Sequence, residues 1–134
     1  MIKSFTLVMG VSLKPHRYSH LAVKRLIASE HPTIGVGLRP GVIGDVPILT
    51  FKEAFAKSKL PKNTEDGFPD IDTITLYIGP RHQPEYYDLI LNINPRRVIF
   101  NPGTENMELV GRLQKAGIYA EVACTLVLLS TDQY

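Results

Sequence analysis

Short apolar runs alternate with helical patterns along nearly the whole chain. The runs are typical of strands buried on both faces, and they lie at about residues 4–9, 33–37, 46–49, 72–78, 97–100 and 118–123. Between them, apolar residues at helical spacing predict helices over about 18–30, 52–57, 84–93 and 104–117. Residues 58–69 are polar and rich in turn formers, which predicts a surface loop, and 124–129 form a last apolar stretch.

Several residues mark the ends of these predicted helices. Pro32 ends the first of them. His82 or Gln83 can cap the helix that carries Pro84 in its first turn. Thr104 is the expected N-cap of the following helix, and Gly117 fits its C-terminal cap.

The alternation predicts an α/β fold of three layers, with a doubly wound, mainly parallel sheet of five or six strands between helices. Right-handed crossovers give the order 3-2-1-4-5, with the sixth strand at an edge. Pro47 places the third strand toward the other edge. Winding then reverses between strands 4–9 and 72–78, and ligands of such sheets bind in the crevice at that point, outside the strand carboxyl ends.

Composition and charge exclude several classes of protein. The 134 residues suit one domain, 1–134, and a net charge of +2 is too small to indicate a nucleic-acid binder. The apolar run Phe5–Met9 is too short for a signal peptide or a membrane span, and a single cysteine, Cys124, excludes an internal disulfide. We therefore expect a cytoplasmic protein. The histidines lack the spacing of metal ligands, so we also expect no metal site.

The loop after the first strand has the features of a phosphate site. Gly10 and Ser12 precede two cations, Lys14 and Arg17, at the start of a predicted helix, whose N-terminus favours anions. Ser12 stands where the dinucleotide fingerprint G-x-G-x-x-G has its second glycine, which weakens the case for a nicotinamide cofactor. The alternative is that Gly10 and Ser12 only shape a strand-to-helix turn.

Arg39 follows the second strand, where a site for NAD usually carries a carboxylate for the ribose. No Asp or Glu lies between Glu30 and Asp45. An arginine at this point indicates a phosphorylated ribose, as in coenzyme A or NADP, unless it is only a solvated loop residue.

Five segments together carry a family resemblance: Gly10–Ser19, Val36–Arg39, Thr75–Ile78, Ile99–Asn106 and Glu121–Leu126. They resemble the small stand-alone CoA-binding domain proteins, whose Rossmann-like fold is similar to the N-terminal CoA domain of the succinyl-CoA synthetase α subunit. The resemblance implies phosphates at the first loop, adenosine near Arg39, and a pantetheine arm between the loops after the fourth and fifth strands. It thereby implies these CoA-binding residues: Gly10, Ser12, Lys14, Arg17, Tyr18, Ser19, Arg39, Tyr77, Ile78, Gly79, Pro80, Asn101, Pro102 and Gly103.

The expected function is non-catalytic binding of coenzyme A or an acyl-CoA, in a carrier, sensor or regulatory role, with a homodimer or another protein partner possible. The chain has no room for the catalytic domain of the synthetase, and it lacks a Gly-x-Ser-x-Gly nucleophile turn and a pair of carboxylates for acid–base chemistry. Cys124 is expected to be a buried hydrophobe or a thiol that forms a mixed disulfide with CoA.

Two other functions stay open from the sequence. An NADP-dependent reductase needs the same Arg39 and a proton donor such as Tyr18 or Tyr77. An interaction protein whose nucleotide site is vestigial needs neither.

Overall fold

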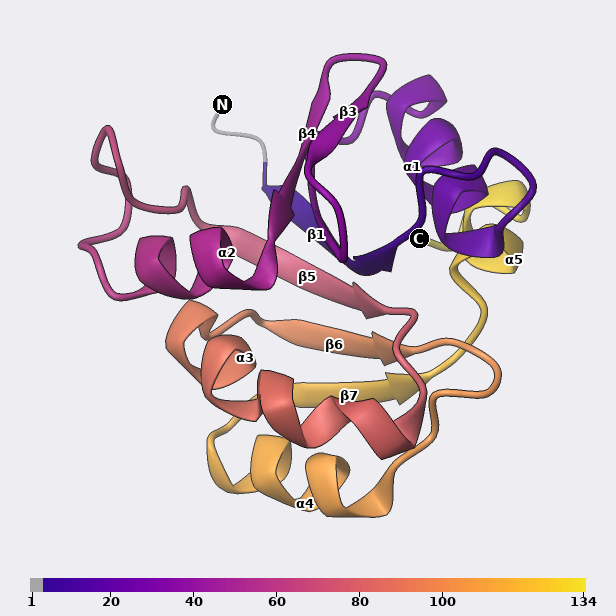
Figure 1. Ribbon diagram of the computed structural model, residues 1–134. Helices are drawn as coiled ribbons and strands as arrows, with labels where there is room; N and C mark the ends of the chain where they lie inside the picture. Colours follow the sequence, from indigo (N-terminus) through magenta and orange to yellow (C-terminus); the bar gives the residue numbers. More distant parts are fainter. Residues whose placement is uncertain (1–3) are drawn as a thin grey trace.

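A computed structural model describes residues 4–134, so the first three residues of the expected domain lie outside the described part (Figure 1). One seven-stranded sheet has the order β3-β4-β2-β1-β5-β6-β7, and all neighbours are parallel except β3 and β4. The strands are β1 (Phe5–Val11), β2 (Thr33–Gly37), β3 (Gly41–Ile43), β4 (Val46–Thr50), β5 (Ile71–Leu76), β6 (Arg97–Phe100) and β7 (Tyr119–Val122). The helices are α1 (Tyr18–Ala28), α2 (Phe51–Ser58), a 3-10 helix η1 (Pro80–Tyr86), α3 (Tyr87–Ile93), α4 (Met107–Lys115) and α5 (Thr125–Ser130).

The predicted fold class and strand order are confirmed, and the structure adds one strand. Residues 41–43, which lie between the predicted strands 33–37 and 46–49, form β3 and pair antiparallel with β4 through a two-residue turn at Gly44 and Asp45. Gly44 has a φ of +57°, which a tight hairpin turn requires. Pro47 lies opposite Val42 in this hairpin, one strand in from the sheet edge.

Both faces of the central strands β1, β2, β5 and β6 are buried, as the apolar runs predict, whereas the residues of β7, at the sheet edge, are exposed or half-buried. In β1, Leu7 and Met9 pack with α2, α3 and α4, whereas Val8 packs with α1 and the hairpin strands on the opposite face. Figure 1 shows the two groups of helices on either side of the sheet, with α5 beside α1. The last apolar stretch of the sequence is thus α5, which returns from the edge strand to cover the α1 face.

Two predicted helix starts are wrong. The side chain that caps α4 is Asn106, whose Oδ1 accepts the N–H groups of Glu108 (3.1 Å) and Leu109 (3.3 Å). Thr104 Oγ1 is turned away and donates to the carbonyl of Asn101 at 2.8 Å. The helix expected from Pro84 begins earlier, as η1, and neither His82 nor Gln83 caps it. Gly117, with a φ of +75°, does follow the end of α4 as expected.

Tyr134 joins the segment after α5 to the opposite end of the sheet. Its hydroxyl lies 2.6 Å from Thr6 Oγ1, its ring packs edge-on against His31, and the Arg97 guanidinium lies 4.9 Å from the ring centre. These contacts hold residues 131–134 against the beginning of β1.

We expect Tyr134→Ala to lower the free energy of unfolding by about 2–3 kcal/mol, because it removes a largely buried aromatic ring and its cation–π contact. Tyr134→Phe should cost only about 1 kcal/mol, the value of one hydrogen bond. Urea unfolding followed by circular dichroism measures both variants, and an unchanged midpoint for Tyr134→Ala would show that the contacts contribute nothing.

Candidate functional site

The strand order reverses between β1 and β5, and the loops at the carboxyl ends of the sheet meet there. Because these strands are parallel, the segments after β1, β2, β5 and β6 all leave the sheet at the same end. Figure 1 shows β5, β6 and β7 ending on the same side. This is the place at which the sequence predicts the ligand crevice.

Gly10 brings the end of β1 against the segment after β5. Its φ is +101°, and a Cβ built on it would lie 2.8 Å from Ile78 Cγ1 and 3.0 Å from the backbone carbon of Tyr77. The Tyr77 N–H donates to the carbonyl of Met9 at 2.8 Å. The glycine therefore permits close packing at the base of the crevice, and this packing accounts for its place in the sequence.

The turn after Gly10 is held by its own hydrogen bonds. The Ser12 N–H donates to Ser19 Oγ at 3.0 Å, and the Lys14 N–H donates to Ser12 Oγ at 3.1 Å. His20 Nδ1 lies 3.0 Å from the Ser12 carbonyl oxygen, a contact that the sequence did not indicate. The Ser12 N–H is thus already used inside the loop and is not available to a phosphate, while the Ser12 hydroxyl still has its own proton to donate.

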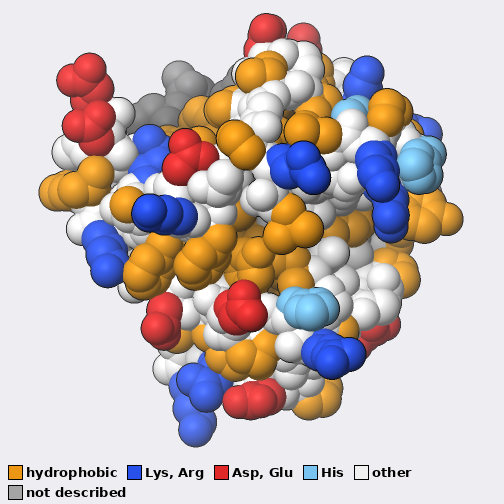
Figure 2. Space-filling view, in the orientation of Figure 1, with side chains coloured by type: hydrophobic (Ala, Val, Ile, Leu, Met, Phe, Trp, Pro, Cys, Tyr) orange, Lys and Arg blue, Asp and Glu red, His pale blue; other side chains and the backbone are white. Residues whose placement is uncertain are grey.

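The N-terminus of α1 opens onto this loop. Arg17 is the N-cap residue and offers no side-chain acceptor, so the N–H groups of the first turn remain available to an anion. The side chains of Lys14, Arg17 and Arg39 are exposed and form no ion pair within residues 4–134. Figure 2 shows Lys, Arg and His side chains gathered over the α1 side of the molecule.

Arg39 lies on the neighbouring loop. The Leu13 side chain reaches within 3.1 Å of the Cβ position at Gly41, so the segments after β1 and β2 are in contact. Leu38, between β2 and Arg39, is 92% exposed, and Tyr18 at the start of α1 is 73% exposed. The cations and these apolar side chains are thus exposed on the neighbouring segments after β1 and β2 and at the start of α1.

The Tyr77 side chain lies on the opposite face of the sheet from Leu76 and Ile78, which are buried in the core under α2, α3 and α4. Its ring packs with the cluster under α1 and α5, and its hydroxyl is buried without a hydrogen-bond partner among the described residues. The nearby hydroxyls of Thr75 and Thr125 bond to each other at 2.7 Å. Burial raises the pKa of Tyr77 to about 12, with a further contribution from the neighbouring Cys124 thiol.

This raised pKa predicts how stability changes in alkali. The folded value of about 12 lies above the unfolded value of 10.0, so below pH 10 the contribution is fully present and it is lost as pH rises from 10 to 12. Wild type should lose roughly 2–3 kcal/mol more than Tyr77→Phe over this range. Because Phe leaves no unpaired hydroxyl, Tyr77→Phe should also be about 1 kcal/mol more stable at pH 7. Urea unfolding at each pH measures both effects, and parallel curves for the two proteins would contradict the assignment.

Asn101 is buried in the loop after β6 and is 1% exposed. Its Nδ2 donates to Thr75 Oγ1 (2.7 Å) and to the Leu76 carbonyl (2.9 Å). Its Oδ1 accepts the N–H of Thr125 at 2.8 Å. The side chain is therefore used to join β5, β6 and α5, while Pro102 and Gly103 are exposed beside the crevice.

Exposure changes along the segment after β5. Gly79 and Pro80 are exposed after β5, whereas Ile78 is buried. Cys124 is half-buried directly before α5, and its reaction with a CoA thiol stays a prediction.

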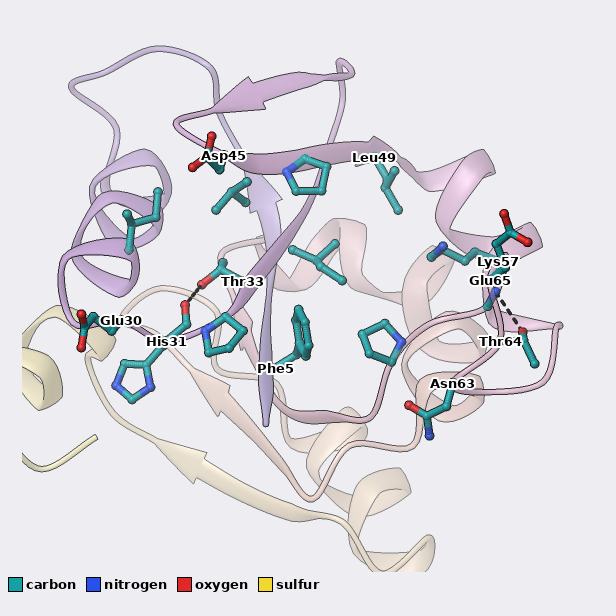
Figure 3. A pocket seen from close by; sticks show the side chains of 17 residues that line it. Phe5, Glu30, His31, Thr33, Asp45, Leu49, Lys57, Asn63, Thr64 and Glu65 are labelled. Atoms are coloured by element: carbon teal, nitrogen blue, oxygen red, sulfur yellow. Dashed lines mark hydrogen bonds between the residues drawn. The ribbon is translucent and has the colours of Figure 1, made fainter. Parts of the chain in front are cut away.

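A hollow lies at the opposite end of the sheet (Figure 3). It has a volume of about 970 Å³ and is bordered by the beginnings of β1, β2 and β4 and by the loop before β5. Glu30, Asp45 and Glu65 lie on its rim, which is unfavourable for a polyanionic ligand. None of the residues predicted to bind CoA lines it.

The described part of the chain has neither a cluster of metal ligands nor a membrane-spanning helix. Residues 4–134 contain no group of three or more His, Cys, Asp or Glu side chains arranged to hold a metal ion. Within the same residues, no helix has both the length and the apolar character needed to span a bilayer.

The strand order defines a doubly wound α/β domain, and comparison with known proteins agrees. The model of the CoA binding domain family matches residues 5–130, so the chain belongs to this family. A search of curated protein sequences finds no match.

Solved structures share the fold. The chain is 36% identical to a protein described only as uncharacterized, with all of both chains covered and a TM-score of 0.83. It is 22% identical to a conserved hypothetical protein from Pyrococcus furiosus, over 94% of this chain and 98% of that one, with a TM-score of 0.71. A dinucleotide-forming acetyl-coenzyme A synthetase from Ca. Korarchaeum cryptofilum, in complex with phosphate and ADP, is 14% identical over 91% of this chain and 26% of its own, with a TM-score of 0.67.

Proposed function

We propose that the protein binds coenzyme A or an acyl-CoA in the crevice between β1 and β5 and performs no chemistry on it. One observation carries the proposal: the uncapped N-terminus of α1 follows β1 at the reversal of strand order, with Lys14 and Arg17 directly before it and Arg39 on the neighbouring loop, and these three exposed cations have no ion-pair partner in the described residues. Coenzyme A has a diphosphate and a ribose 3′-phosphate, which need such an environment. Membership of the CoA binding domain family supports the same ligand.

The proposal gives each part of the ligand a place. The diphosphate lies at the first turn of α1, near the Ser12 hydroxyl, Lys14 and Arg17. The 3′-phosphate lies near Arg39, whose guanidinium can bind it in bidentate fashion. The pantetheine arm lies between Gly79–Pro80 and Pro102–Gly103.

The surroundings of Ser12 favour binding over catalysis. His20 Nδ1 contacts the carbonyl of Ser12 and not its hydroxyl, so His20 is not placed to take the hydroxyl proton. Ser12 Oγ instead accepts the Lys14 N–H. The proposed role is therefore that of a carrier, a sensor or a regulatory subunit.

Calorimetric titration with CoA, dephospho-CoA and NADP, after removal of any co-purified ligand, tests the proposal. CoA should bind, and affinity should fall when the 3′-phosphate is removed. Binding of NADP without CoA would instead support a reductase. No heat from any of the three would support an interaction protein with a vestigial site.

A further inference from the structure

A buried glutamine joins the two segments that flank the proposed pantetheine site. Gln83, in η1, is 0% exposed. Its Nε2 donates to the carbonyl of Ile78 at 2.8 Å and to the carbonyl of Thr104 at 2.7 Å. The first carbonyl belongs to the segment after β5 and the second to the loop after β6. One amide nitrogen therefore joins the two segments that form the walls of the proposed pantetheine site, the segment after β5 and the loop after β6.

The other end of the Gln83 amide is also fixed. Its Oε1 accepts from Asn106 Nδ2 at 2.9 Å, and the same Nδ2 donates to the hydroxyl of Tyr87 at 2.9 Å. Asn106 Oδ1 accepts two N–H groups at the start of α4, so the Asn106 amide cannot be reversed. Two carbonyl acceptors likewise fix the orientation of the Gln83 amide.

All the polar atoms of this amide have partners within the protein, so it has no free N–H to offer a ligand. Its effect on a ligand must come through the position of the walls. On the Thr104 side, the Thr104 N–H and Oγ1 both donate to the Asn101 carbonyl, at 3.0 and 2.8 Å. These two hydrogen bonds close the Pro102–Gly103 turn, and the hydrogen bonds of Gln83 connect this turn to the segment after β5.

We infer that Gln83 is a positioning residue: it sets the separation of the Gly79–Pro80 and Pro102–Gly103 walls and so determines how tightly the pantetheine arm is bound. The inference rests on the proposed function. If Gln83 only contributes to folding, its replacement lowers stability but leaves the relative affinities for long and short ligands unchanged.

The test compares CoA with 3′-phospho-ADP, which has the same phosphates but no pantetheine. Gln83→Glu keeps the shape but loses the donating nitrogen, and Gln83→Met removes both polar ends. Asn106→Asp is a milder change that keeps the α4 cap and places a carboxylate against Gln83 Oε1. Ile93→Val, a substitution in the core of α3, is the matched control for lost stability.

We expect the Gln83 variants to weaken CoA binding about tenfold while the affinity for 3′-phospho-ADP changes less than about twofold. Asn106→Asp should act in the same direction, and Ile93→Val should change neither affinity. An equal loss for both ligands, or no loss for either, in whichever of the Gln83 and Asn106 variants fold, overturns the inference. If wild type binds neither ligand, the proposed function itself fails.

Discussion

Arg39→Ala should weaken CoA binding by about ten- to a hundredfold and leave dephospho-CoA nearly unaffected. The Arg39 side chain is exposed on the loop after β2 and is not among the ion pairs of residues 4–134. Its guanidinium is therefore available for the ribose 3′-phosphate, and each charge-assisted hydrogen bond contributes roughly 1.5–3 kcal/mol. Calorimetry with the two ligands measures the difference directly.

Arg25→Ala is the matched control for this experiment. Arg25 is also an exposed arginine, but it lies in the last turn of α1, away from the crevice. It should leave both affinities unchanged. Equal losses for CoA and dephospho-CoA in Arg39→Ala would show that Arg39 does not contact the 3′-phosphate.

Gly10→Ala should lower the free energy of unfolding by about 3 kcal/mol or more. The φ of +101° is unfavourable for any residue with a Cβ, and the added carbon would lie 2.8 Å from Ile78 Cγ1 and 3.0 Å from the Tyr77 backbone. Backbone atoms cannot move aside as a flexible side chain can, so β1 and the segment after β5 must separate. Urea unfolding measures the loss.

Gly111→Ala separates this effect from the general consequence of replacing glycine. Gly111 lies inside α4, and no atom is found within 4 Å of its Cβ position. Alanine there should stabilise the helix by about 0.5–1 kcal/mol. If Gly10→Ala were as stable as wild type, the close packing at the base of the crevice would be contradicted.

The sheet could be predicted because its strands are continuous apolar runs, and right-handed crossovers leave few possible orders. β3 could not, because Gly41, Val42 and Ile43 are too few to show a period and are strand only through pairing with β4. Thr104 is a suitable cap by residue type, but the fold uses its hydroxyl at Asn101 and leaves the cap to Asn106.

The cations of the candidate site could be placed from sequence because they follow strand ends. The directions of the Tyr77 and Asn101 side chains could not be predicted from sequence. Tyr77 follows Leu76 on the alternate face of the sheet and so packs under α1 and α5. Gln83 gave no signal either, since its partners are backbone carbonyls that only the folded loops bring together.

CoA should occupy the crevice between β1 and β5, and a titration of the ¹⁵N-labelled protein with CoA, followed by backbone amide shifts in NMR spectra, tests this directly. We expect the largest shifts at the first turn of α1, at Arg39, at Gly79 and at Gly103, with little change around the hollow near Glu30. Shifts concentrated at that opposite end of the sheet, with the α1 turn unaffected, would contradict this expectation.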